Sequence, residues 1–135
     1  MRCAIALFLL CLALGAHAAS DDYAKRLGYL VNAYRAEHGG KELVPDSKIA
    51  ALAREHSAEM AKAHKMDHEG FPSRVRRSGL AMCLENVGWN YSTAQAQFEA
   101  WKKSSGHNSN MLDRRVARMG IGEVDGYVTF IACGS

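Results

Sequence analysis

The chain has 135 residues, 48% of them hydrophobic, and 17 Lys and Arg against 14 Asp and Glu give a net charge of +3. This length allows one domain with a hydrophobic core, and the nearly balanced charge gives no reason to expect a nucleic-acid partner. No linker, repeat or low-complexity tract interrupts the chain, so we expect a single folded domain.

Residues 1–18 have the features of a secretory signal. Arg2 gives a positive start, an apolar run covers residues 4–14, and small residues stand at Ala16 and Ala18, where a signal peptidase reads the chain. The apolar run is shorter than the roughly 20 residues that span a bilayer. We therefore expect cleavage after Ala18 and export to the periplasm or the cell exterior.

Cleavage at that point leaves one domain at residues 19–135, without a transmembrane segment and with two cysteines, Cys83 and Cys133. Two cysteines in an exported protein most simply form a disulfide. Two alternatives stay open at this stage. One is a lipoprotein anchored through Cys11, and the other is Cys83 as a nucleophile beside His107.

Helices are predicted in four places, from apolar residues at helical spacing and from capping residues. The first begins at Asp21 or Asp22 and stops at residues 39–40, the second opens at Pro45-Asp46 and ends near His64, the third covers Ser73 to Ser78 before Gly79, and the fourth starts with a capping box from Ser92 to Gln95.

Strands are predicted at residues 81–88, 119–124 and 127–132. The last two flank Asp125-Gly126, a preferred pair for a tight hairpin turn. Helices come first, followed by a strand, a helix and a hairpin. This order indicates an α+β layered domain in which helices cover a small antiparallel sheet.

Three polar residues could form a site if the fold brings them together: His68, Glu85 and His107. Glu85 interrupts an apolar strand, where an unpaired carboxylate would be costly, so it needs a partner, and the histidines are obvious choices. The alternative is a carboxylate that binds backbone amides and holds a loop. We expect Gly106 to turn the chain so that His107 projects from the end of a helix.

Other histidine arrangements are less favourable. Lys65 follows His64 where a zincin helix needs glutamate, so that metalloprotease motif is absent. Ser104 and His107 lack the strand-turn-helix elbow of a serine hydrolase. His56 lies on the apolar stripe of the second helix, where we expect a core residue with satisfied hydrogen bonds rather than a ligand.

Taken in order, several segments resemble the CAP superfamily, which groups cysteine-rich secretory proteins, antigen 5 and plant pathogenesis-related proteins of group 1, in the short bacterial form called the SCP domain. The resemblance covers nearly all of the mature chain. The matching segments are Val31 to Arg35, Ala53 to Ala61, Asp67-His68, Arg74-Val75, Glu85 to Val87, Trp101 with Ser104 to His107, Asn110 to Leu112, and Met119 to Gly122.

This resemblance implies a three-layer α–β–α sandwich with a cleft where His68, Glu85 and His107 converge. Some family members bind a divalent cation such as zinc through the two histidines. Ser104 stands where the family commonly has a second acidic residue. Two imidazoles leave the coordination to be completed by water, so we expect weak, exchangeable binding at His68 and His107, with Glu85 orienting one ring.

The function that follows is an exported, monomeric module that binds a ligand or partner. The resemblance allows a lipid, a small molecule, or an envelope or extracellular protein, and it does not choose among them. Two alternatives remain. One is a metal-assisted, peptidase-like hydrolase with Glu85 as general base, and the other is a structural module stabilised by its disulfide.

Overall fold

The computed structural model describes residues 4–135, with side chains described at residue 15 and from residue 17 onward. Arg2 and the side chain of Cys11, which bear on the signal and lipoprotein predictions, lie outside this description. The elements in chain order are α1 (Ala4–Glu37), β1 (Val44–Pro45), α2 (Ser47–Ala63), α3 (Phe71–Ser78), β2 (Met82–Trp89), α4 (Ala94–Lys102), α5 (Ser105–Leu112), β3 (Arg118–Val124) and β4 (Tyr127–Gly134).

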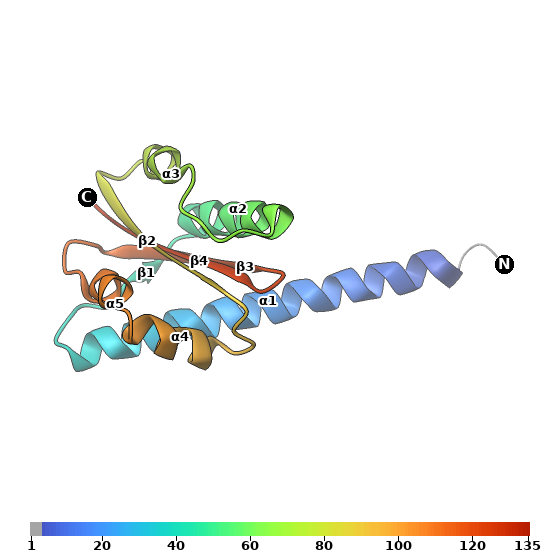
Figure 1. Cartoon of the computed structure of the whole chain (residues 1–135), viewed down its shortest axis with the longest axis horizontal. Helices are drawn as coiled ribbons and strands as arrows, with labels where there is room; N and C mark the ends of the chain where they lie inside the picture. The colour runs from blue at the N-terminus through green and yellow to red at the C-terminus, as the bar shows by residue number, and fades with distance from the viewer. Residues whose placement is uncertain (1–3) are drawn as a thin grey trace.

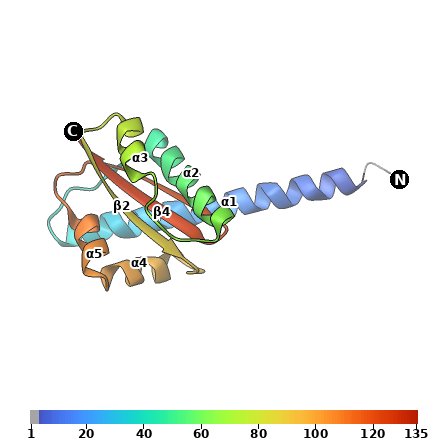
Figure 2. The same cartoon turned by 45° about the horizontal axis from the view of Figure 1, so that its top comes forward.

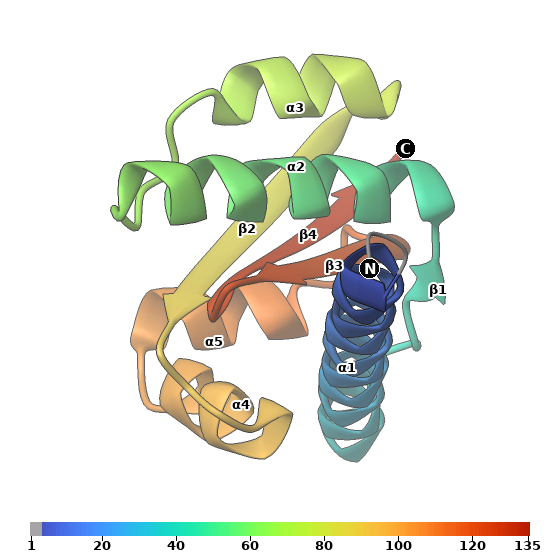
Figure 3. The same ribbon diagram turned by 90° about the vertical axis from the view of Figure 1, so that its right-hand side faces the viewer.

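The domain has three layers, as Figures 1 and 3 show. A four-stranded sheet lies in the middle, α2 and α3 cover one face, and α1, α4 and α5 cover the other. The predicted α–β–α sandwich is therefore confirmed. Within the part of the chain that the structure describes, no helix combines the length and hydropathy needed to cross a bilayer.

The strand order in the sheet is β1-β3-β4-β2. The three predicted strands pair antiparallel, but the short strand β1 pairs with β3 in parallel, so the sheet is mixed. Two residues are too short a run to show the alternation that predicts a strand. The hairpin prediction is confirmed, because Asp125 and Gly126 both have positive φ, 50° and 82°, as a tight two-residue turn requires.

The helix predictions hold for α2 and α3, but α1 is longer than expected. It begins at Ala4 instead of Asp21 or Asp22, since the apolar run rich in Ala and Leu continues into the amphipathic part without a proline. The first turns of α1 project away from the sheet in Figure 1. The helix runs through the expected cleavage point after Ala18, and cleavage stays a prediction.

Two features between α4 and β3 differ from the sequence prediction. Thr93, not Ser92, caps α4 by accepting a hydrogen bond from the backbone N–H of Ala96. A further helix, α5, then contains Gly106 and His107. Gly106 is therefore a helical residue, and the prediction that it turns the chain is wrong.

Hydrophobic side chains fill both sides of the sheet. The larger cluster lies between the sheet and α1, α4 and α5, and includes Leu27, Trp101 and Phe130. A smaller cluster under α2 contains the predicted disulfide, in which Cys83 on β2 joins its direct neighbour Cys133 on β4. This bond also excludes the alternative that Cys83 is a free nucleophile.

Candidate functional site

Glu85 is the centre of the candidate site. It lies on β2, at an edge of the sheet, and its side chain is only 1% exposed. The main partner of its carboxylate is Arg74, which donates from Nε to Oε2 at 2.7 Å and from Nη2 to Oε1 at 2.8 Å. We expected histidines in this role, but a guanidinium matches a carboxylate with two parallel hydrogen bonds and neutralises its charge.

Arg74 reaches Glu85 because α3 lies beside α2 and close to β2, as Figure 2 shows. Gly70 precedes α3 with a φ of 74°, and Pro72 stands in its first turn. The remaining guanidinium nitrogen of Arg74, Nη1, donates to the carbonyl of Glu69 at 2.7 Å. All three nitrogens of this buried cation therefore have acceptors, so Arg74 holds the loop before α3 as well as Glu85.

His68 is the second partner of Glu85. Its Nδ1 lies 2.9 Å from Glu85 Oε1, while 53% of its side chain is exposed. An ionised carboxylate can only accept, so Nδ1 carries the proton in this pair. In the neutral ring, Nε2 then keeps its lone pair. Glu85 thus orients a half-exposed imidazole whose Nε2 has a lone pair available for a metal ion, an arrangement typical of metal-binding histidines.

His107 lies in the first turn of neighbouring α5, half-buried near the ring of Trp101 at a centroid distance of 6.3 Å. Burial, followed by repulsion from His68, lowers the pKa of His107 below its ordinary value. The fold places His107 on a helix that packs against β2, the strand whose Glu85 contacts His68.

Asparagine side chains connect β2 to α5. Asn86 is buried and donates to the carbonyl of His107 at 3.0 Å. Asn110 donates to the carbonyl of Glu85 at 3.2 Å and to Asn86 Oδ1 at 2.9 Å. The backbone that carries His107 is therefore tied to the strand that carries Glu85, and this fixes the relative position of the two residues.

Ser104 caps the N-terminus of α5, but its side chain makes no capping hydrogen bond. Within the described residues it makes no hydrogen bond to His68, Glu85 or His107 either. The fold thus places Ser104 about one turn before His107, without a side-chain hydrogen bond to the other three residues within the described part of the chain.

His56 is buried on α2, as its place on the apolar stripe predicted. Its Nε2 donates to the carbonyl of Asp67 at 2.8 Å, and its Nδ1 lies 3.3 Å from Glu59 Oε2. The same Nε2 is 4.0 Å from Glu85 Oε1. His56 therefore supports the loop before His68, and it lies near Glu85 without a hydrogen bond to it.

The chemistry open to this site follows from these contacts. Among the described residues, no group of three or more His, Cys, Asp and Glu side chains is arranged to hold a metal ion. Both Glu85 oxygens accept hydrogen bonds from Arg74 or His68, which leaves His68 Nε2 and the His107 ring as possible ligand atoms.

Sequence reasoning missed Arg74 as a site residue. The need of Glu85 for a cation was readable, but three arginines lie between residues 74 and 77 and the pattern does not choose among them.

Residues 29–133 match the sequence profile of the CAP family, described as the Cysteine-rich secretory protein family. The chain belongs to the CAP family. This membership confirms the resemblance drawn from the ordered segments.

A curated relative is the uncharacterized membrane protein YlbC of Bacillus subtilis (strain 168), 27% identical over 112 residues, which are 78% of this chain and 32% of YlbC. The CAP chain thus spans about a third of that relative.

Solved structures of other bacterial proteins share the CAP fold. An extracellular protein containing a SCP domain from Bacillus anthracis str. Ames has a TM-score of 0.82 at 23% identity, over 86% of this chain and 41% of that one. A cysteine-rich secretory protein from Staphylococcus aureus has a TM-score of 0.79 at 19% identity, over 86% of this chain and 39% of that one. An outer surface protein from Borrelia burgdorferi has a TM-score of 0.70 at 16% identity, over 80% of this chain and 87% of that one.

Proposed function

We propose that this CAP protein is an exported binding module whose cleft holds a divalent cation such as zinc weakly between His68 and His107. The observation that carries the proposal is the 2.9 Å contact between Glu85 Oε1 and His68 Nδ1. It orients the imidazole with Nε2 available, and the lowered pKa of His107 favours a neutral second ring at neutral pH. Neutral imidazoles are the form that binds metals.

The residues present fit a weak site rather than a closed one. Structural zinc sites use four protein ligands and catalytic sites use three. Here two histidines are available, and Glu85 acts behind His68 instead of binding the ion, because Arg74 occupies its oxygens. Water or a ligand would complete the coordination. A bound cation would supply a positive charge that attracts an anionic group of the partner.

The hydrolase alternative receives less support from these contacts. It requires Glu85 to act as a general base on a water molecule. The Glu85 side chain is 1% exposed and accepts hydrogen bonds from Arg74 and His68 on its two oxygens. A carboxylate that is buried and hydrogen-bonded in this way is poorly placed to take a proton from water. We therefore place Glu85 as a positioning residue for His68 and propose binding as the primary role.

Export is supported by two kinds of observation. The structural relatives include an extracellular protein and an outer surface protein. The Cys83–Cys133 disulfide suits an oxidising compartment. We propose that residues 1–18 are the signal and that the mature protein works as a monomer in the periplasm or outside the cell, on a lipid, a small molecule or an envelope protein.

Calorimetric titration with zinc tests the cation site. We expect weak binding by the wild-type protein and loss of the heat in His68→Ala and in His107→Ala. Glu85→Gln should weaken binding by about tenfold, as loss of an orienting carboxylate usually does. His38→Ala, one residue after the end of α1, is the matched control and should bind as the wild type does. Equal heats in wild type, His68→Ala and His107→Ala would rule the site out.

A second experiment separates binding from catalysis. The zinc-loaded protein is incubated with a broad peptide and ester library, and both turnover and retention are measured. Retention without turnover supports the binding module. Turnover that disappears in Glu85→Gln would instead support the hydrolase and assign Glu85 a catalytic role that its contacts do not favour.

A further inference from the structure

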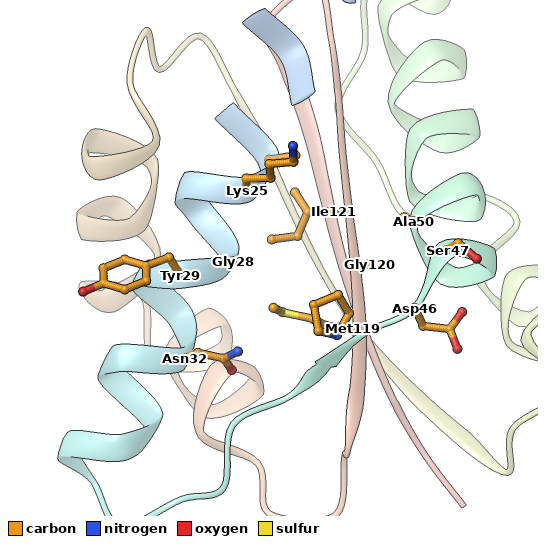
Figure 4. Close-up of a pocket in the computed structure, with 12 residues that line it drawn as sticks. Lys25, Gly28, Tyr29, Asn32, Asp46, Ser47, Ala50, Met119, Gly120 and Ile121 are labelled. Atoms are coloured by element: carbon orange, nitrogen blue, oxygen red, sulfur yellow. The ribbon is translucent and has the colours of Figure 1, made fainter. Parts of the chain in front are cut away.

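A cavity of about 570 Å³ lies away from the histidines, at the open edge of β3. Figure 4 shows its two walls, with α1 on one side and the start of α2 on the other, and β3 between them. Gly28 on α1 and Gly120 on β3 are among the residues that line it. We call this space the β3-edge groove. Its lining is mostly apolar, with Met119 and Ile121 on the floor.

Strand β3 forms the floor of the β3-edge groove, and only part of its outer edge is hydrogen-bonded to β1. Strand β1 pairs with β3 only at Arg118 and Met119, and the last bond of this pairing runs from the Asp46 N–H to the Met119 carbonyl at 2.8 Å. Alternate residues of a strand present both backbone groups to the same side. The next residue of β3 that faces the open edge after Met119 is therefore Ile121.

The far end of this edge is already satisfied. The carbonyl of Glu123, the following outward-facing residue, accepts hydrogen bonds from the hydroxyl of Ser20 and from Arg54 Nη1 at 3.2 Å. Ile121 stands between these capped positions. Phe130, which lies opposite Ile121 on β4, forms a non-hydrogen-bonded pair with it, and no hydrogen bond to the Ile121 backbone from outside the β3–β4 pair occurs within the described residues. Its N–H and C=O are thus open to an added partner.

These backbone groups favour an extended peptide over an acyl chain. An acyl chain would fill the apolar walls but would cover a backbone donor and acceptor without pairing them, which is costly. A peptide in β conformation pairs with both groups and places alternate side chains against the walls from α1 and α2. Strand β1 already uses this edge in the parallel direction, so the edge geometry suits such an addition.

Charge gives the peptide a direction. Lys25 lines the β3-edge groove and lies at its Ile121 end in Figure 4. Its ammonium group forms no ion pair among the described residues. Arg54 adds a second cation beyond this end, beside the Glu123 carbonyl. A peptide that runs parallel to β3, as β1 does, would bring its C-terminal carboxylate to Lys25.

We propose that the β3-edge groove binds a short extended peptide with apolar side chains and a free C-terminus. The peptide adds to β3 beside Ile121, continues the line of β1, and pairs its carboxylate with Lys25. This binding is independent of the His68 and His107 cleft, because the two lie at opposite edges of the sheet.

Fluorescence anisotropy of a labelled pentapeptide of alternating valine and threonine, with a free C-terminal carboxylate, tests the proposal on the purified protein. Two further peptides carry an N-methyl group on alternate amides, in opposite phases. We expect one phase to weaken binding by about fivefold to tenfold, since it removes an N–H that pairs with β3, and the other phase to bind unchanged. Equal affinities for the two phases would overturn strand addition.

Variants then locate the site. Ala50→Trp places a large side chain in the β3-edge groove from α2 and should abolish binding. Lys25→Gln should weaken the acid peptide severalfold but leave a C-terminal amide peptide unaffected, and Lys62→Gln on the outer surface of α2 is the matched control. His68→Ala should bind the peptide normally. Competition by palmitate together with equal binding of both methylation phases would show that the groove is a lipid site and would reject the proposal.

Discussion

Arg74 and Glu85 form a buried ion pair that connects α3 to the sheet through two parallel hydrogen bonds of 2.7 and 2.8 Å. Their side chains are 5% and 1% exposed. The pair places the carboxylate where His68 can use it, so the chemistry of the exposed imidazole depends on a contact that solvent does not reach. Stability and binding are consequently linked at this position.

The buried pair predicts a large and asymmetric response to mutation. Arg74→Met should lower the free energy of unfolding by about 3–5 kcal/mol, because it leaves the Glu85 carboxylate buried without its cation. The double variant Arg74→Met with Glu85→Gln should recover part of this loss, since it removes the stranded charge. Urea unfolding measures both variants, and the double variant being the less stable of the two would contradict this account.

The exposed pair between Arg77 and Glu55 is the matched control for that experiment. It has a similar 2.7 Å contact from the same helix, but the two side chains are 51% and 47% exposed. Water screens such pairs, and they contribute little to stability. Arg77→Met should therefore leave the urea midpoint nearly unchanged while Arg74→Met lowers it strongly.

His107 predicts a pH dependence of stability. Burial, followed by the charge of His68, lowers its pKa in the folded state, so below the ordinary histidine value the unfolded chain binds more protons. The contribution of neutral His107 to the free energy of unfolding should be fully present above about pH 6.5 and fall as the pH drops below that value. With a chelator present, urea midpoints of the wild type should decrease more between about pH 7.5 and 5.5 than those of His107→Gln. Parallel curves would refute the assignment.

The sequence predicted the architecture better than the contacts of the site. Apolar spacing and caps located α2, α3, β2 and the hairpin, because each of these elements carries its own local signal. Strand β1 and helix α5 were missed because β1 has two residues and α5 is nearly free of large apolar side chains. Tertiary packing decides their conformation, and a local pattern cannot show it.

The order of motifs placed His68, Glu85 and His107 in one region, but the sequence did not show what holds Glu85. That required knowing which face of α3 turns toward β2. Arg74, Arg76 and Arg77 are equivalent in composition, yet Arg74 alone of the three is buried. The distinction rests on the entry of the chain into α3 at Gly70, a three-dimensional feature.

The disulfide predicts a measurable loss on removal. Cys83 and Cys133 are 50 residues apart, and closing a loop of that length contributes about 4 kcal/mol on the chain-entropy model. The double variant Cys83→Ala with Cys133→Ala should lose a comparable amount in urea unfolding. Zinc binding at pH 7.5 should persist while the protein is folded, since neither histidine contacts the bond. Unchanged stability would show that the loop is already ordered in the unfolded chain.

Close packing between β3 and α2 predicts opposite effects for two glycines. A Cβ at Gly120 would lie 2.0 Å from the backbone nitrogen of Ala50, so Gly120→Ala forces helix and sheet apart. We expect a loss of about 3 kcal/mol, the upper range for overpacked cores. A Cβ at Gly106 meets nothing within 4 Å, and the residue lies in α5.

Gly106→Ala should therefore raise stability by about 0.5–1 kcal/mol, because alanine is the better helix former. Thermal unfolding of the two variants beside the wild type measures this contrast. It also distinguishes a helical Gly106 from the turn that the sequence suggested, since a glycine that turned the chain with positive φ would make alanine destabilising at this position. A lower melting temperature for Gly106→Ala would accordingly argue that His107 is carried by a loop and not by α5.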